Sequence, residues 1–300
     1  MEASKPHKGM LVVAWGVVLG IALAKPVLQE ILGIPVSESL QYAIWGAIVA
    51  AALALTLFWQ ALRPLRPFAI LFVVFIAVDW FVHTRLDQLP LVNRLLNDPS
   101  FSVAILAEKL LNLIVALVVI GVLFLLKRNR NAFFLAKGDT SAPVEPVPWL
   151  GVKRGETWKS FGRNLSWILS LGTLAFLVIA GRPPLDLVAR VLPFLPVILL
   201  VSALNAFNEE VTYKASFLSV LEGPLGKAQA LGVMAAFFGI LHFYGVPYGV
   251  VGVLMAGFLG WLLGKSMLET RGMFWAWFLH LIQDVWIFAF LAIGSIRAGG

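Results

Sequence analysis

The sequence predicts an all-α, polytopic transmembrane helix bundle of about eight to nine spans. Of its 300 residues, 60% are hydrophobic and 13% are charged, whereas soluble domains average about 45–50% apolar and about 25% charged residues. Apolar segments of roughly 17–25 residues, the length that crosses a bilayer, recur along the chain. Basic residues gather in one loop between two such segments. These observations exclude a soluble globular protein and predict contact with membrane lipids.

Nine segments are apolar enough to be read as spans. The first is short and is interrupted by Lys25-Pro26, and a cleaved signal peptide is disfavoured because further spans follow it. The expected spans lie at about 9–24, 41–62, 68–84, 103–126, 164–181, 192–213, 228–244, 248–264 and 273–292.

The basic loop sets the expected orientation and the division of the chain. Residues 127–163 hold eight basic and three acidic side chains, a large part of the net charge of +7. Loops rich in Lys and Arg face the cytoplasm, which is favoured here over a lipid-headgroup or nucleic-acid patch. We therefore expect a four-span N-terminal region of unknown role (1–130), a basic cytoplasmic loop (131–163) and a five-span region (164–300). The N-terminus is expected in the cytoplasm, the membrane is expected to be the plasma (inner) membrane, and no nucleic-acid partner is expected.

The chain contains no cysteine. Disulfides, thiolate nucleophiles, iron–sulfur clusters and thiolate zinc sites are therefore excluded. Any catalytic or metal-binding chemistry has to come from carboxylates, imidazoles and other side chains.

Ionisable residues occur inside three consecutive spans of the C-terminal region. Glu209 and Glu210 lie in the segment 192–213, and the next spans carry His242 and the pair His280 and Asp284. A charged side chain at mid-membrane costs about 2.5–3.5 kcal/mol on insertion scales. Such residues therefore mark a functional site, with a structural ion-pair network as the alternative.

Helical spacing predicts which of these side chains share a face. Residues i and i+4 lie on one face, while neighbours point about 100° apart. Glu210 is therefore expected to pair with Lys214, and His280 with Asp284. Glu209 and Glu210 are not expected to face the same point, which leaves Glu209 unpaired and makes it the better candidate for chemistry.

The same spacing places Phe238 beside His242, against the wall of the site. At about 1.5 Å per residue, the glutamates and both histidines lie on the order of 13–22 Å from the cytoplasmic boundary. Three helices can therefore bring them to one level. Asn205 lies one turn before Glu209 and is expected to support it. Another such pair, Asp79 and His83, is interpreted as a helix-end or interhelical contact.

The three motifs, in this order, resemble those of the CAAX-protease and bacteriocin-processing (CPBP, or Abi) family of intramembrane proteases. The resemblance covers roughly residues 190–292. The family usually has Arg-Gly where this chain has Lys214-Ala215, and lysine cannot form the bidentate fork of arginine. The motifs read Glu209-Glu210-Val-Thr-Tyr-Lys214, Phe238-Gly-Ile-Leu-His242 and His280-Leu-Ile-Gln-Asp284.

The resemblance implies a peptidase that cleaves a membrane-associated protein or peptide, with residues 164–300 as its core. It implies Glu209 as the base that activates water, with either oxyanion stabilisation or metal binding by His242 and His280. Whether Glu209, His242 and His280 hold zinc is left open by the resemblance. The H-E-x-x-H spacing of common zinc proteases is absent from the sequence. The implied catalytic set is Glu209, Glu210, His242, His280 and Asp284, supported by Lys214, Phe238 and Asn205.

Two other functions are compatible with the same residues. A proton- or cation-coupled transporter could use the carboxylates as a relay. A non-catalytic immunity or scaffolding relative would need the motifs only for structure. A histidine on each of two further helices at the depth of the carboxylates favours hydrolysis.

Overall fold

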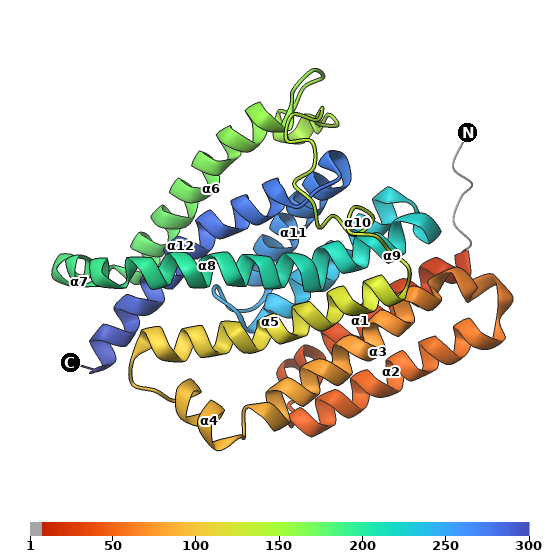
Figure 1. Cartoon of the computed structure of the whole chain (residues 1–300), viewed down its shortest axis with the longest axis horizontal. Coiled ribbons are helices and arrows are strands. Elements are labelled where there is room, and N and C mark those ends of the chain that lie inside the picture. Colours follow the sequence, from red (N-terminus) through yellow and green to blue (C-terminus); the bar gives the residue numbers. More distant parts are fainter. Residues whose placement is uncertain (1–7, 300) are drawn as a thin grey trace.

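The computed structural model describes residues 8–299, without the side chains of residues 185 and 297–299. The described chain is a bundle of long helices with one long loop (Figure 1) and contains no strand, only two isolated bridges in that loop. Short 3-10 or π segments, labelled η, extend several helices. The elements are α1 (Lys8–Pro26), η1 (Val27–Ile31), α2 (Glu38–Phe58), η2 (Gln60–Leu65), α3 (Arg66–Phe81), η3 (Val82–Leu86), α4 (Pro90–Leu96), α5 (Phe101–Leu125), η4 (Pro148–Leu150), α6 (Trp158–Gly181), α7 (Leu185–Val191), η5 (Leu192–Phe194), α8 (Leu195–Glu209), η6 (Glu210–Ala215), α9 (Ser216–Leu225), α10 (Lys227–Leu241), η7 (His242–Tyr244), α11 (Val250–Thr270) and α12 (Phe274–Gly299).

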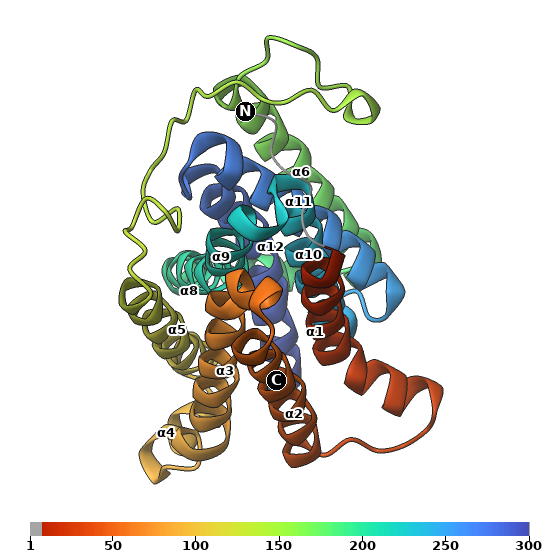
Figure 2. The ribbon, with the colours of Figure 1, turned by 90° about the vertical axis from the view of Figure 1, so that its right-hand side faces the viewer.

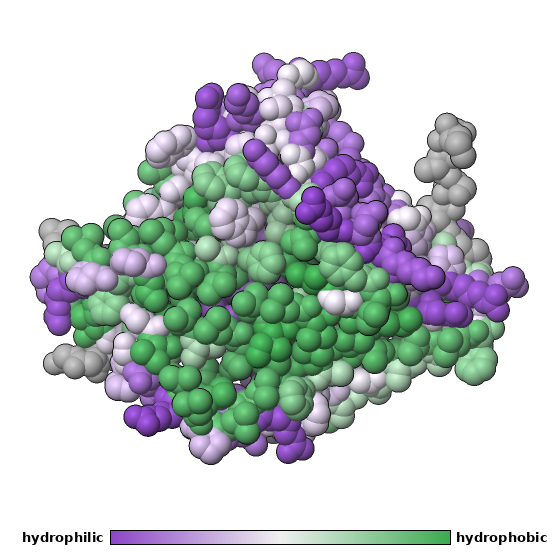
Figure 3. Space-filling model, viewed as in Figure 1, coloured by the Kyte–Doolittle hydropathy of each residue, from purple (hydrophilic) through white to green (hydrophobic). Residues whose placement is uncertain are grey.

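Eight helical segments in the described range are long and apolar enough to cross a membrane. The all-α polytopic prediction is confirmed, but the segment expected at 228–244 is not among the eight. It forms α10, whose 15 residues extend only about 22 Å at 1.5 Å per residue. The fifth span also begins earlier than expected, at Trp158. Figure 3 shows the apolar belt across the bundle, with hydrophilic residues at its edges.

The N-terminal helices and the C-terminal helices share one hydrophobic core. It runs from Met10 to Leu279 and includes a cluster of phenylalanines from α3, α9 and α10. The ring of Phe217 lies 4.8 Å from that of Phe72 and 5.2 Å from that of Phe237. Burying an aromatic ring contributes on the order of 1.5–3 kcal/mol. Helix α3 is therefore fixed directly against the helices that carry the site.

Helices α10 and α11 form a tightly packed pair because glycine lies between them. A Cβ on Gly239 would come within 2.7 Å of the Val253 carbonyl oxygen and 2.8 Å of the Gly257 Cα. Small residues allow such close backbone approach in membrane helices. This contact fixes α10, and with it His242 at the end of α10.

The long basic loop passes over one end of the bundle, from α5 to α6 (Figure 2). Glu145 of this loop forms an ion pair with Lys227 at the start of α10. The backbone N–H of Asp139 donates to the carbonyl of Thr270 at the end of α11, at 2.8 Å. The start of α10 and the end of α11 therefore lie on the same side of the bundle as the basic loop.

Candidate active site

The site is built on one long helical segment that changes its winding at the two glutamates. Helix α8 ends at Glu209 and continues into the six-residue π segment η6, then into α9. The backbone stays helical through the junction, with φ −73° and ψ −39° at Glu209. A π turn holds more residues than an α turn, so it changes the direction in which successive side chains point, and such turns are frequent at functional sites.

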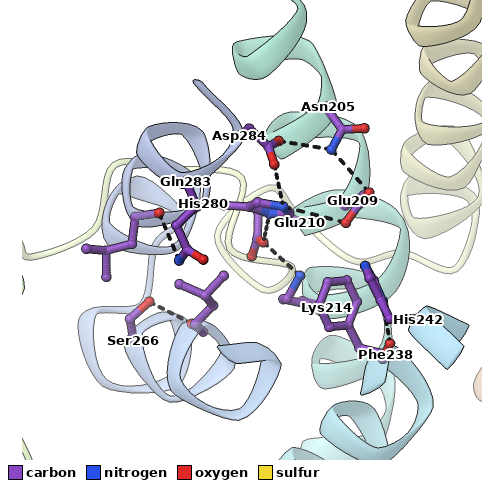
Figure 4. Close-up of polar contacts among 12 residues, drawn as sticks. Asn205, Glu209, Glu210, Lys214, Phe238, His242, Ser266, His280, Gln283 and Asp284 are labelled. Atoms are coloured by element: carbon purple, nitrogen blue, oxygen red, sulfur yellow. Dashed lines mark hydrogen bonds and ion pairs between the residues drawn. The ribbon is translucent and has the colours of Figure 1, made fainter. Parts of the chain in front are cut away.

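Both glutamates reach the same imidazole ring, that of His280 on α12 (Figure 4). Glu210 Oε1 lies 2.7 Å from His280 Nδ1, a hydrogen bond. Glu209 Oε2 lies 3.6 Å from His280 Nε2. The expectation that the two glutamates would not face the same point is therefore wrong. The π winding begins between them, and an imidazole presents its two nitrogens on opposite edges, so two diverging carboxylates can flank one ring.

Glu210 is committed to a second partner, as the spacing predicted. Its Oε1 lies 2.8 Å from the ammonium nitrogen of Lys214, and neither side chain has any exposed surface. The same ammonium lies 3.4 Å from the centre of the Phe238 ring, a cation–π contact that is strong when desolvated. Glu210 therefore neutralises Lys214 and orients His280, and it is inaccessible to substrate.

Asn205 joins the remaining two carboxylates. Its side-chain amide donates to Asp284 Oδ2 at 2.9 Å and to Glu209 Oε1 at 3.2 Å. The other oxygen of Asp284 lies 3.7 Å from His280 Nε2. Asn205 therefore holds Glu209 and Asp284 on the same side of the imidazole. The structure brings the expected pair His280 and Asp284 together, with Asn205 between two like charges.

His242 lies in η7, at the end of α10, and its ring is 4.4 Å from that of Phe238. Its Nδ1 is 2.8 Å from the Phe238 carbonyl oxygen. Because a carbonyl only accepts, Nδ1 must carry the proton of this bond, which leaves Nε2 free to act. Phe238 also lies 6.4 Å from the His280 ring. It is thus the wall against which Lys214 and both histidines pack.

Glu209 differs from Glu210 in being reachable. Its side chain is 22% exposed, and it lines a cavity of about 80 Å³. The cavity is also lined by Asp79 and His83 from the N-terminal helices, and by Asn112 of α5. The sequence interpretation of Asp79 and His83 as a structural pair missed this placement. Their i, i+4 spacing in an apolar span is the same signal that marked His280 and Asp284.

The proposed metal ligands do not form a chelating arrangement. In the described part of the chain, no group of three or more His, Asp or Glu side chains is placed to hold a metal ion. Glu210, Lys214 and Asn205 already occupy several of the donor atoms around His280. We therefore derive no step through a metal at Glu209, His242 and His280.

Comparison with protein families points to the same segment. Residues 191–286 match the family described as type II CAAX prenyl endopeptidase Rce1-like. This segment is similar to the CAAX proteases. The match confirms the resemblance seen in the three motifs, and all the candidate residues from Asn205 to Asp284 lie within it. No curated protein and no solved structure matches the chain.

The Rce1-like match supports a CAAX-type intramembrane protease in general terms, and the family implies a peptidase. The eight apolar helical segments indicate an integral membrane protein, and a membrane protease of this kind would act on membrane-associated peptides. The N-terminal helices, including Asp79 and His83, lie outside the matched residues.

Proposed function

We propose that this Rce1-like protein is an intramembrane endopeptidase in which Glu209 activates the attacking water. The observation that carries the proposal is the difference between the two glutamates. Glu210 is fully buried between Lys214 and His280, whereas Glu209 opens to a polar cavity. A general base needs hydrogen-bond reach to water. Only Glu209 of the pair has this access.

In the proposed reaction, Glu209 removes a proton from water as the water oxygen attacks the scissile carbonyl carbon. The carbonyl oxygen becomes an oxyanion, and the proposed donor is the Nε2–H of His280 in its imidazolium form, since Nδ1–H already bonds Glu210. His242 donates from Nε2 in the same way only when both of its ring nitrogens carry a proton, because its Nδ1–H bonds the Phe238 carbonyl. Oriented donors of this kind stabilise developing negative charge. The C–N bond then breaks, and the proton held by Glu209 passes to the leaving amine.

Glu210 and Asp284 have orienting roles in this scheme. Glu210 accepts the Nδ1–H of His280, which directs Nε2 toward Glu209 and Asp284. Asn205 keeps Asp284 next to Glu209 without direct contact between the carboxylates. Lys214 balances the charge of Glu210 and lies over Phe238. The proposal thus assigns a role to each of the site residues predicted from the sequence.

The substrate class follows from the setting of the site. The catalytic side chains lie among apolar helices, so we propose that the substrate is a peptide or protein held in the membrane, with a prenylated CAAX tail as one case to test. We also propose that the N-terminus and the basic loop face the cytoplasm of a plasma (inner) membrane protein, because Lys and Arg concentrate there.

The test uses the full chain in lipid nanodiscs with a panel of lipid-anchored peptides, including farnesylated CAAX-terminated peptides. Glu209→Gln should abolish cleavage while keeping the protein folded. Glu222→Gln, which alters a surface ion pair with Arg271, is the matched control and should cleave normally. Cleavage by Glu209→Gln at the wild-type rate would reject the proposal.

Two further measurements distinguish a transporter and a metal-dependent peptidase from the proposed function. Proton or cation flux in proteoliposomes that is lost in Glu209→Gln, without any cleavage, would show a transporter. Cleavage that a chelator abolishes and zinc restores would show that a metal takes part in spite of the present arrangement of donors.

A further inference from the structure

A second polar group lines the same cavity as Glu209, and it comes from the helices outside the Rce1-like segment. The hydroxyl of Tyr42 on α2 lies 2.7 Å from Asp79 Oδ2 on α3. His83, one turn later in η3, has its Nε2 3.7 Å from Asp79 Oδ1. Two ionisable residues inside an apolar span carry an insertion cost, and no motif of the Rce1-like segment includes them.

The cavity connects this group to the proposed base. Asp79 and His83 line it on one side and Glu209 on the other, and between them its walls carry further polar side chains. With a volume of about 80 Å³, it has room for several water molecules, and each can find the polar partners that a buried water needs. The remaining lining residues are Asn112, Val115, Asn208, Thr212 and Tyr213.

Two of the residues that line the cavity have polar groups suited to binding water. Glu209 Oε2 is buried and has no hydrogen-bond partner among the described residues. His83 is 37% exposed and, at 3.7 Å, lies beyond hydrogen-bond distance of Asp79. Glu209 therefore keeps a carboxylate oxygen that no side chain hydrogen-bonds, and His83 keeps an imidazole without a short bond to Asp79.

We propose that Asp79 and His83, anchored by Tyr42, are positioning residues that hold the hydrolytic water against Glu209. This inference rests on the proposed function. Water enters the cavity and is held from the far wall by His83, which lies beside the carboxylate of Asp79. Glu209 then takes one proton of that water while its oxygen forms the new bond to the carbonyl carbon. The proton leaves with the amine when the C–N bond breaks, so the far-wall residues are unchanged by the cycle.

The inference gives the N-terminal helices a role in catalysis. Helix α3 is fixed against α9 and α10 through the ring contacts of Phe72 with Phe217 and Phe237. The far wall is therefore held at a defined position relative to the near wall. A site of two walls, each from a different part of the chain, is complete only when both parts are present.

The experiment measures kcat and KM for cleavage by His83→Ala, Asp79→Asn and Tyr42→Phe in nanodiscs. We expect kcat to fall about 10- to 100-fold in His83→Ala, because the water loses the hydrogen bond that positions it, while KM stays unchanged. Exogenous imidazole should restore part of the rate. Thr84→Ala is the matched control, because this neighbour bonds only its own helix at the Trp80 carbonyl.

The outcomes separate this inference from the proposed function. If Glu209→Gln is inactive while His83→Ala and Asp79→Asn cleave like wild type, the positioning role is rejected and the function of Glu209 stands. If Glu209→Gln cleaves like wild type, the proposed function is rejected, and this inference is rejected with it. If His83→Ala loses thermal stability and imidazole restores nothing, Asp79 and His83 are structural and the inference is wrong. Unchanged stability with a rate that imidazole restores supports it.

Discussion

Lys214 and Glu210 form an ion pair without any contact with solvent, with Nζ and Oε1 2.8 Å apart. Removing two charges from solvent costs several kcal/mol per ion, and their mutual attraction has to offset this cost. Here further partners help, because Phe238 lies under the ammonium and His280 hydrogen-bonds the carboxylate. The pair explains how this chain maintains its site with lysine at a position where the resembling family usually has arginine.

Breaking this pair from one side should destabilise the protein more than removing both charges. We expect Lys214→Met to lower the free energy of unfolding by about 3–5 kcal/mol, because the buried Glu210 loses its lysine counter-charge and keeps only its contact with His280. Glu210→Gln combined with Lys214→Met should lose less than the sum of the single changes. Thermal unfolding in detergent measures this cycle. A Lys214→Met protein as stable as wild type would contradict the ion pair.

The bridging amide of Asn205 should be needed for activity. Asn205→Ala removes the donor shared by Glu209 and Asp284, and loss of a hydrogen bond to a charged group costs about 1.5–3 kcal/mol. We therefore expect about a 10- to 100-fold loss of kcat. Ser202→Ala is the matched control one turn earlier, because that buried hydroxyl has no hydrogen-bond partner in the described structure. Equal effects of the two changes would show that Asn205 has no special role.

Much of this arrangement could be predicted from spacing alone. The i, i+4 rule identified Glu210 with Lys214, His280 with Asp284 and Phe238 with His242, since each pair lies on one helix. Apolar segment lengths gave the helices to within a few residues for most spans. Local periodicity is enough for contacts within a helix.

The sequence could not show contacts that depend on winding and on packing between helices. The π segment after Glu209 has no sequence signature, and without it the meeting of both glutamates at His280 was not expected. The placement of Asp79 and His83 opposite Glu209 depends on how α3 packs on α9 and α10. Such tertiary contacts between distant segments leave no trace in the spacing of a single sequence.

The packing of α10 on α11 gives a prediction that compares two glycines. Gly239→Ala should destabilise the protein by about 1–3 kcal/mol, because its Cβ would lie 2.7 Å from a backbone oxygen that cannot move aside. Gly232→Ala on the same helix should be neutral or stabilising, since its Cβ would meet only Trp15 at 3.5 Å. The melting temperatures of the two variants measure this difference. A larger loss in Gly232→Ala than in Gly239→Ala would contradict the close approach of α10 and α11.

The ion pair between Glu145 of the basic loop and Lys227 gives a prediction about stability at low pH. The hydrogen bond from Lys227 holds the pKa of Glu145 below its ordinary value. A carboxyl with a lowered folded-state pKa stabilises the protein above its unfolded pKa and loses this effect as the pH falls through the folded pKa. Glu145→Gln should therefore lower the melting temperature slightly at pH 7 and have no effect at pH values below the folded pKa. Because Glu145 is 63% exposed, the loss should stay below about 1 kcal/mol and shrink in high salt.

Glu269 forms a buried ion pair with Lys265, which can be compared with the exposed ion pair of Glu145 and Lys227. It is only 3% exposed, pairs with Lys265 and accepts the indole N–H of Trp158 at 2.8 Å. Glu269→Gln should therefore cost more than Glu145→Gln, because it leaves the Lys265 ammonium, 6% exposed, without its closest counter-charge. The difference should persist in high salt, since buried pairs are screened less than exposed ones. Melting temperatures of both variants at low and high salt measure it, and equal, fully screened losses would contradict the burial of Glu269.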